Sequence, residues 1–342
     1  MHDHTRKQAK LTLYAVSRRK VLARLTMLAT AVILITMFGR GFTAFGQVSL
    51  KPGDIIYADS GDAIQGGFVI KVDPATGEQS VISSGGYLQM PFEPVVDAMG
   101  HIVVSDSGRL IRINPDTGGQ TILADNGSGP LGFPYGLAVN RYGNILAANL
   151  QAVVLVDAQD GQIGIVSAGG NLLHPLAVAV ASNGQIFAVN IGLSRQIIRI
   201  NPQTGAYWVV SEGGLLKNPQ AIAVKGNDLY ITDVATSDGN FGIGRVIHVE
   251  AQSGTQTVIS EGGNLVGPVG IAVDAKGQLI VGDPYTVNPA SLDIVDGGYD
   301  GGIIIIDPVT GAQQLLARGR GSYVNPRGVA VVANFGPTHK GP

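Results

Sequence analysis

The sequence predicts an all-β protein, a six-bladed β-propeller with four strands in each blade. A unit that ends on a proline repeats six times, at intervals of 43, 41, 44, 49 and 58 residues. Repetition at this period is typical of stacked or radial repeat architectures. A turn motif recurs once per unit, and a strand missing from the first unit reappears near the C-terminus. The repeat prolines are Pro91, Pro134, Pro175, Pro219, Pro268 and Pro326.

Each unit contains four short apolar runs, which are clearest in the fourth unit, residues 176–219. There the runs cover residues 176–180, 185–190, 196–201 and 206–211. β-Branched and small apolar side chains bounded by Gly, Asn or Pro are typical of β-strands. No segment beyond residue 50 keeps a helical apolar period, so we expect strands throughout the repeats.

A five-residue turn separates the third and fourth runs of every unit. It begins with Asp, Asn or Glu, ends with Gly, and has Pro at its second position in four copies. An Asp or Asn side chain accepts a hydrogen bond from the amide two residues on, Pro favours a type I turn, and Gly tolerates a positive φ. We therefore interpret the turn as structural. The copies span residues 73–77, 114–118, 157–161, 201–205, 250–254 and 307–311.

A Ser-x-Gly-Gly motif ends the fourth run in four units. A Gly pair can resemble a phosphate-binding loop, but no helix follows it here to supply a row of amides. We interpret the motif as an exit bend between blades. The copies span residues 83–86, 167–170, 211–214 and 260–263.

The two ends of the repeat array predict how the ring closes. The first unit begins at residue 53 with a run that corresponds to a second strand. A matching first strand, residues 327–331, follows the last repeat proline. We expect this C-terminal strand to complete the first blade, which closes the ring. The predicted propeller spans residues 47–336, followed by a disordered tail at 337–342.

The repeats resemble the NHL-repeat and streptogramin-lyase-like propellers, which are related in shape to the gluconolactonase group. The resemblance rests on the pattern Pro-x-Gly-Leu/Ile-Ala-Val-Asp/Asn-x-x-Gly-Asn/Gln-Leu/Ile, followed by Ile-Ile-Arg-Ile-Asn-Pro-x-Thr-Gly, over residues 53–336. Because the matching residues belong to the scaffold, the resemblance implies the fold and leaves the ligand open.

The first 46 residues differ in character from the repeats. A basic segment precedes an uncharged apolar run, residues 25–38, and a small-residue exit, which together predict a secretory signal peptide. The order Ser-Arg-Arg-x-apolar-Leu at residues 17–22 further resembles a twin-arginine (Tat) signal. An ordinary signal and an uncleaved anchor stay open as alternatives. We expect a periplasmic or extracellular protein without stable membrane insertion after signal removal.

The net charge and the lack of Cys restrict the kinds of partner and anchor that this protein can have. Residues 1–46 hold eight Lys or Arg and one Asp, so the rest carries 15 basic and 24 acidic residues, a net charge of −9. This charge argues against nucleic acid and anionic membrane surfaces as partners. The absence of Cys excludes disulfides and a lipoprotein anchor. We expect a monomer that binds a small molecule, a glycan or a protein.

One face of the ring carries loops of unequal length, and such variable loops on a rigid scaffold are common binding sites. The loops between strands two and three are minimal in blades 2 and 3 and longer in blades 1, 5 and 6, at residues 60–67, 234–244 and 284–301. These insertions are expected to form a wall beside the channel mouth. Their Asp and Gly residues suit Ca²⁺, although a solvated acidic loop is the simpler interpretation.

Every second strand ends on an acid or amide, which places a polar ring near the channel mouth. In the gluconolactonase-like group, to which the repeats bear a resemblance, carboxylates and amides near this level hold a catalytic divalent metal, so a Ca²⁺ or Mg²⁺ site is one hypothesis. A repeated strand-ending turn explains the same residues structurally. They are Asp59, Asp106, Asn149, Asn190, Asp233 and Asp283.

The positions after the repeat prolines also face the mouth, and there the units differ most. Glu93 is the leading candidate for a general base or metal ligand, and Tyr135, Gln220 and Arg327 are candidate ligand-binding residues. Arg327 is expected either to hold a carboxylate or to pair with Glu93.

Two functions are compatible with these residues, and a purely structural cell-surface part is a third, which differs from the binding module only in its partner. The leading hypothesis is a binding module without chemistry, which acts through the face that carries the insertions of blades 5, 6 and 1. The alternative is a metal-dependent lyase or lactonase with Glu93, Asn149, Asn190 and Asp233 as ligands. Its acid or base is His174, because streptogramin lyases, which the repeats resemble, use a His and a Glu with Mg²⁺. His174 is equally explained as a surface residue before a proline.

Overall fold

The computed structural model describes residues 48–62, 66–170, 172–192, 194–234, 243–285, 301–318 and 325–333. The chain divides into two compact units, Met1–Gly46 and Gln47–Pro342, and the described residues all belong to the second. The predicted signal peptide, the C-terminal tail and most of the insertions of blades 5 and 6 lie outside them. The predicted blade 1 loop is shorter than expected, because residues 60–62 and 66–67 lie in strands. Within these ranges no helix has the length and apolar character needed to cross a membrane.

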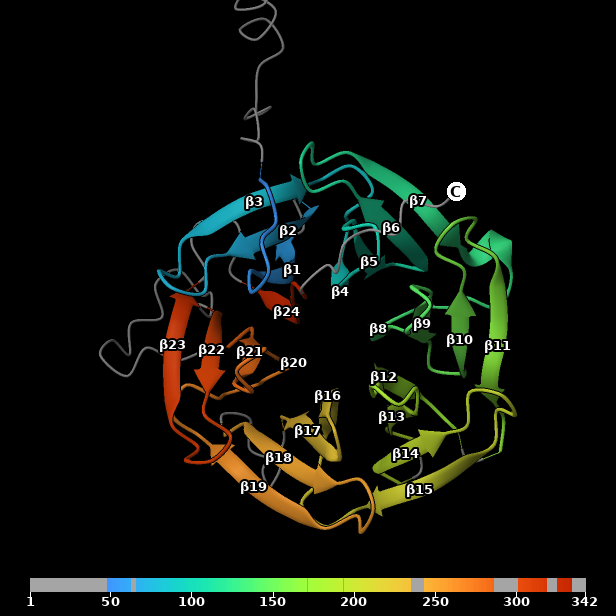
Figure 1. The fold of residues 1–342 in the computed structure, drawn as a ribbon, viewed down its shortest axis with the longest axis vertical. Coiled ribbons are helices and arrows are strands. Elements are labelled where there is room, and N and C mark those ends of the chain that lie inside the picture. Colours follow the sequence, from blue (N-terminus) through green and yellow to red (C-terminus); the bar gives the residue numbers. More distant parts are fainter. Residues whose placement is uncertain are drawn as a thin grey trace, which may run out of the picture. The chain divides into compact units, whose positions relative to one another are not determined.

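Six antiparallel sheets of four strands each form a ring, which confirms the predicted propeller (Figure 1). Blade 1 consists of β24 (Pro326–Val331), β1 (Ile55–Asp62), β2 (Gly66–Val72) and β3 (Gln79–Ser84). Blade 2 consists of β4 (Pro91–Val96), β5 (Ile102–Asp106), β6 (Arg109–Ile113) and β7 (Gln120–Asp125). Blade 3 consists of β8 (Leu137–Val139), β9 (Ile145–Ala148), β10 (Ala152–Val156) and β11 (Ile163–Ala168).

The remaining blades follow the same order from the axis outward. Blade 4 consists of β12 (Pro175–Val180), β13 (Ile186–Asn190), β14 (Gln196–Ile200) and β15 (Tyr207–Glu212). Blade 5 consists of β16 (Pro219–Lys225), β17 (Asp228–Asp233), β18 (Arg245–Glu250) and β19 (Gln256–Glu261). Blade 6 consists of β20 (Gly270–Val273), β21 (Leu279–Asp283), β22 (Gly302–Ile306) and β23 (Gln313–Arg318). One short 3₁₀ helix, Asn126–Ser128, interrupts the described strands.

The C-terminal strand closes the ring as predicted. β24 is the innermost strand of blade 1 and pairs antiparallel with β1, with Ile55 opposite Val331 and Tyr57 opposite Val329. Beyond the strand, the Val332 amide donates to the Asp54 carbonyl over 2.8 Å. Blade 1 therefore joins chain segments about 270 residues apart.

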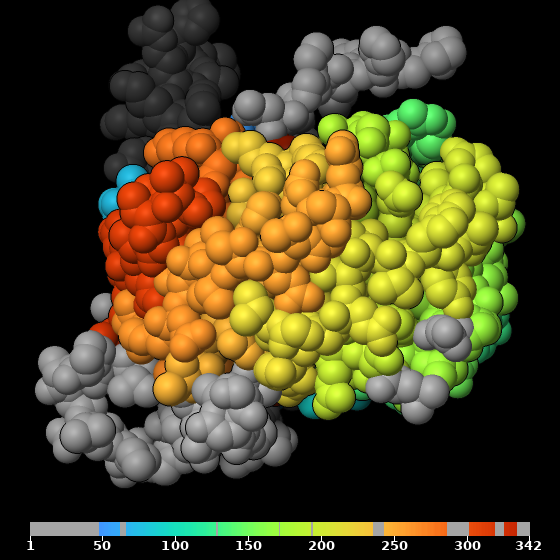
Figure 2. Space-filling model, turned by 90° about the horizontal axis from the view of Figure 1, so that it is seen from below, coloured from blue at the N-terminus to red at the C-terminus, as the bar shows by residue number. Residues whose placement is uncertain are grey.

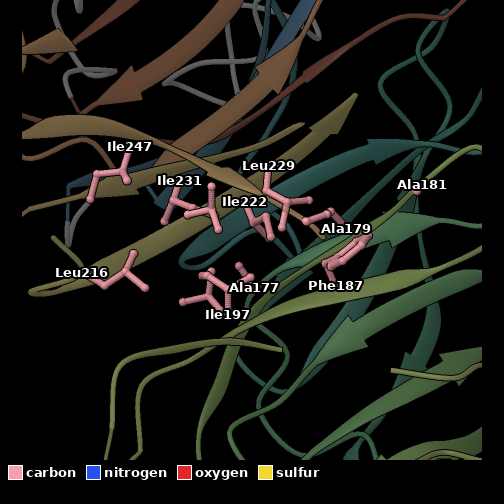
Figure 3. Packing of buried hydrophobic residues seen from close by; sticks show 13 residues of the cluster. Ala177, Ala179, Ala181, Phe187, Ile197, Leu216, Ile222, Leu229, Ile231 and Ile247 are labelled. Carbon is pink, nitrogen blue, oxygen red and sulfur yellow. The ribbon is translucent and has the colours of Figure 1, made fainter. Parts of the chain in front are cut away.

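The hydrophobic core is divided among the interfaces between neighbouring blades. In the cluster between blades 4 and 5, Phe187 and Ile197 pack with Ile222, Leu229 and Ile247 (Figure 3). Five further clusters occupy the ring in the same way. Seen from the edge of the ring, blade 5 lies against blades 4 and 6 (Figure 2). Since the inner strands of each blade are largely buried on both faces, they need near-continuous apolar runs, whereas the outermost strands are partly exposed.

The five-residue turns have the predicted local geometry. In blade 1, Asp73 Oδ1 accepts hydrogen bonds from the amides of Ala75 and Thr76 over 2.8 and 3.0 Å. The closing Gly has a positive φ in all six turns, at Gly77, Gly118, Gly161, Gly205, Gly254 and Gly311.

These turn glycines also form contacts between blades, which the local motif did not predict. A Cβ on Gly161 would lie 1.9 Å from the carbonyl oxygen of Leu123 in the preceding blade. A Cβ on Gly254 would lie 2.1 Å from the carbonyl oxygen of Val210. Gly is therefore required for two reasons. The backbone has a positive φ, and the outer strand of the preceding blade leaves no room for a Cβ.

The Ser-x-Gly-Gly motif also joins neighbouring blades. Ser211 Oγ donates to the carbonyl of turn glycine Gly254 in the next blade over 2.7 Å, and Gln256 Nε2 of that blade donates to Ser211 Oγ over 2.8 Å. The same Ser–Gln pair links blades 1 and 2 through Ser83 and Gln120. The motif is thus an inter-blade clasp as well as an exit bend. A further copy between blades 5 and 6 consists of Ser260, Gly311 and Gln313.

We predict that Gly161→Ala destabilises the propeller by at least about 2 kcal/mol, because its Cβ would clash with the neighbouring blade. Gly184→Ala is the matched control, since Gly184 has a φ of +85° and no atom within 4 Å of an added Cβ. That control should lose only about 1 kcal/mol, the cost of a left-handed backbone. Urea unfolding of both variants measures the difference. Equal losses would contradict the inter-blade role.

Candidate functional site

A cavity of about 130 Å³ opens at the channel mouth, where the six innermost strands begin. All six blades contribute to it through residues that follow the repeat prolines, two from each blade except blade 6, which contributes Val269 alone. A second cavity of about 320 Å³ shares Glu93, Gly136, Ala177 and Ala221 with it and runs along the apolar innermost strands. The mouth is lined by Phe92, Glu93, Tyr135, Gly136, Leu176, Ala177, Gln220, Ala221, Val269, Arg327 and Gly328.

Glu93 occupies a position where every other blade has a small residue. The equivalent residues, two after each repeat proline, are Gly136, Ala177, Ala221, Gly270 and Gly328. A Cβ on Gly328 would lie 2.1 Å from Glu93 Oε2, so the carboxylate rests directly against β24 of the neighbouring blade. The five small residues therefore leave room for this single acidic side chain.

Burial raises the pKa of Glu93 well above its usual 4.5. Its carboxylate accepts no hydrogen bond and forms no ion pair within the described parts of the chain, while its backbone amide donates to Ser105 Oγ over 3.1 Å. A carboxylate in this environment costs folding free energy unless a ligand supplies a donor or a positive charge.

Arg327 does not pair with Glu93, which corrects one of the two expectations for it. Arg327 Nε lies 3.4 Å from Ser60 Oγ, and no ion pair joins Arg327 to Glu93 among the described residues. The arginine instead lies near Asp59. Burial raises the pKa of that carboxyl to about 6, hydrogen bonds from the Gly61 and Asn325 amides oppose the rise, and the charge of Arg327 opposes it further.

The rest of the mouth is aromatic and amide in character. The rings of Phe92 and Tyr135 lie 4.9 Å apart at an interplanar angle of 54°. Gln220 Nε2 donates to Asn218 Oδ1 over 2.9 Å, which fixes the amide at the rim. Phe92 was not among the candidates predicted from the sequence, although an aromatic residue follows the repeat proline only in blades 2 and 3.

The strand-ending acids and amides bind the connections that lead into the innermost strands. Asp233 Oδ2 accepts hydrogen bonds from the amides of Lys217 and Asn218 over 2.7 and 3.0 Å. Asp106 Oδ2 accepts in the same way from Gln89 and Met90. In both blades the carboxylate therefore accepts hydrogen bonds from the backbone amides just before the repeat proline.

The other members of this ring make related contacts. Asp283 accepts from the amides of Val266, Gly267 and Tyr285. Asn149 Nδ2 donates to the carbonyls of Pro130 and Leu131. Asp59 accepts from Gly61 and Asn325, and Asn190 Nδ2 donates to Gln196 Oε1 over 3.2 Å. Within the described ranges no group of three His, Cys, Asp or Glu side chains is arranged to hold a metal ion.

His174 lies apart from Glu93. It is exposed in the loop between blades 3 and 4, has a φ of 65°, and is not among the residues that line the mouth. Its backbone amide donates to the Leu150 carbonyl over 3.0 Å and so links this loop to the one after β9. The structure does not bring Glu93 and His174 together as an acid–base pair at the mouth cavity.

Comparisons with known proteins show similarity in fold alone. No protein-family model and no curated protein matches the sequence. A chain of a nidogen/laminin complex aligns over 81% of this chain and 97% of its own, with a TM-score of 0.62 and 12% identity. The gluconolactonase XC5397 of Xanthomonas campestris aligns over 84% and 91%, with a TM-score of 0.55 and 18% identity. TolB of Acinetobacter baumannii aligns over 81% and 66%, with a TM-score of 0.59 and 13% identity. The chain therefore shares the six-bladed propeller fold with a binding-complex component, a lactonase and TolB.

We predict that Glu93→Gln stabilises the protein by about 1–3 kcal/mol at pH 7.5. The raised pKa means that Glu93 costs increasing stability as the pH rises above its unfolded value, and the neutral amide removes that cost. Exposed Glu78 supplies the control variant Glu78→Gln, which should change stability by less than about 0.5 kcal/mol. Chemical unfolding measures both. A destabilised Glu93→Gln protein would show that Glu93 is a structural residue.

Asp283 predicts a pH dependence of stability. Burial raises its pKa from 3.8 to about 6, although three backbone hydrogen bonds oppose the shift. The folded state then binds a proton more tightly than the unfolded chain, so stability falls as the pH rises from about 4 to about 6. We expect Asp283→Asn to reduce this fall by about 1–3 kcal/mol, measured by urea unfolding across that range. An unchanged pH profile would contradict the raised pKa.

Proposed function

We propose that this protein is an exported binding module that takes a small amine-bearing ligand at the channel mouth. The observation that carries the proposal is the position of Glu93. It is the one large residue in a ring of Gly and Ala, the side chain is half-buried, and its carboxylate accepts no hydrogen bond and forms no ion pair among the described residues. A protonated amine would satisfy that carboxylate, and the rings of Phe92 and Tyr135 beside it suit an apolar or aromatic body.

The surroundings support a ligand of limited size. The mouth and channel cavities, about 130 and 320 Å³, have walls mainly of Ala, Val, Leu and Gly. Gln220 and Arg327 add hydrogen-bond donors at the rim. The proposed contribution of the blade 5 and 6 insertions concerns mostly residues outside the described ranges and stays a prediction, as does export through the N-terminal segment.

Catalysis by a lyase or lactonase has less support. The candidate metal ligands Asn149, Asn190 and Asp233 form hydrogen bonds within the scaffold. His174 lies outside the mouth cavity. The lactonase among the structural neighbours shares only the fold at 18% identity. The metal-dependent enzyme remains the alternative function, and metal binding distinguishes it from the amine-binding module.

The test is calorimetric titration of the purified protein with tyramine, and separately with Ca²⁺, Mg²⁺ and Mn²⁺ after chelation. We expect saturable tyramine binding that weakens at least tenfold in Glu93→Gln, because a neutral amide cannot pair with the ammonium group. The Glu78→Gln variant should bind as the parent protein does. Tight one-to-one metal binding lost in Glu93→Gln would instead favour the lyase or lactonase.

A further inference from the structure

A groove of about 580 Å³ lies between blades 3 and 4, on the face that carries the five-residue turns. It shares no residue with the mouth cavity and only Val180 with the channel. Its floor is apolar and its rim comes from turn residues, including Asn140, Tyr142, Asn183 and Asn201. No Asp or Glu of the described ranges lines it, although the protein beyond residue 46 carries a net charge of −9.

Arg199 in this groove lacks the acidic partner that the repeat gives to equivalent residues. In four blades the third strand carries a basic side chain at the same repeat position. Its cross-strand neighbour is the second residue of the apolar run in the second strand. Three of these side chains pair with acids: Lys71 with Asp54 at 3.5 Å, Arg112 with Asp97 at 3.3 Å, and His248 with Asp228 at 2.8 Å. The fourth basic side chain is Arg199, which lies opposite Phe187.

The missing partner follows from two substitutions within blade 4. The position of Asp97 is occupied by Ala181, and the position of Asp228 is occupied by Gln185. No ion pair involves Arg199 among the described residues. Its guanidinium instead lies 5.6 Å from the ring centroid of Trp208, its cross-strand neighbour. The charge is thus available to an anion.

Trp208 is a second departure from the repeat. It is the only Trp of the chain, and half of its side chain is exposed. Across the groove, Arg141 lies over the ring of Tyr142 at 4.7 Å, and Tyr142 is 72% exposed. The groove thus has two aromatic rings with arginines on them. The residues equivalent to Trp208 in the other blades are Ser80, Thr121, Gly164, Thr257 and Gln314.

The amide side chains at the rim add hydrogen-bond donors. Oδ1 of Asn140 accepts from the Tyr142 amide, and Oδ1 of Asn183 accepts from the Gln185 amide. Asn201 Oδ1 accepts from Gln203 in the same way. Because each oxygen is engaged by its own turn, the group that each residue presents to a ligand is its NH₂ donor.

We propose that this groove binds an acidic glycan, with Arg199 holding a uronate carboxylate and Trp208 packing against a sugar ring. Arg pairs with carboxylates through a fork of donors, aromatic faces suit the apolar C–H face of a pyranose, and amide donors suit its hydroxyls. The volume of about 580 Å³ lies within the range of small-molecule binding sites. The binding requires no contribution from the channel mouth.

The test uses the fluorescence of Trp208 in the full chain, titrated with tri-galacturonate. We expect a saturable change in emission, a binding constant at least tenfold weaker for neutral maltotriose, and no saturable response to penta-glutamate. No saturable signal with tri-galacturonate, which calorimetry would check independently, overturns the proposal. Equal binding of penta-glutamate overturns the assignment to a glycan.

The repeat supplies variants that should fold. Ala181→Asp restores the acid found at Asp97 and should engage Arg199, so we expect tri-galacturonate binding to weaken at least tenfold without loss of unfolding free energy. Arg199→Leu takes the residue of blade 3 at Leu155 and should have the same effect. Lys217→Gln, an exposed charge removed outside the groove, is the control and should bind normally. Unchanged binding in Ala181→Asp or Arg199→Leu would overturn the role of Arg199.

Discussion

The pairing of β24 with β1 is the constraint on which the whole ring depends. Blade interfaces supply most of the core, and each interface needs a neighbour on both sides. Without β24, blade 1 would lose its innermost strand and leave the backbone of β1 unpaired along the axis. The channel mouth would also lose Arg327 and Gly328, the residues that lie beside Ser60 and Glu93. Closure thus stabilises the scaffold and completes the candidate site.

Motifs that look local in the sequence turn out to join neighbouring blades. The turn Gly meets the outer strand of the preceding blade, and the Ser of Ser-x-Gly-Gly binds the carbonyl of that Gly in the next one. The strand-ending acids have a similar role near the axis, where Asp106 and Asp233 bind amides of the incoming connection. The repetition of such contacts around the ring explains why these positions vary so little within the chain.

The two candidate sites follow from departures from the repeat. At the mouth, Glu93 replaces Gly or Ala, and no partner for its carboxylate lies among the described residues. In the groove, Ala181 and Gln185 replace acids, which leaves Arg199 beside an exposed Trp208. In each case the scaffold tolerates a charge that it does not neutralise. A charged residue without an ion-pair partner does not stabilise the fold through pairing. We therefore assign each of these two charges to the binding of a ligand.

The sequence by itself determined the number of blades, the strands, the turns and the closure, because these depend on local propensity and on repetition along the chain. It also selected Glu93, Tyr135, Gln220 and Arg327, since the repeat brings equivalent positions to one level around the axis. The tertiary structure decided which oxygens face the scaffold, where Arg327 points, and that Arg199 lacks an acid. Those outcomes depend on contacts between blades, and the spacing of residues within one repeat does not encode side-chain direction across an interface.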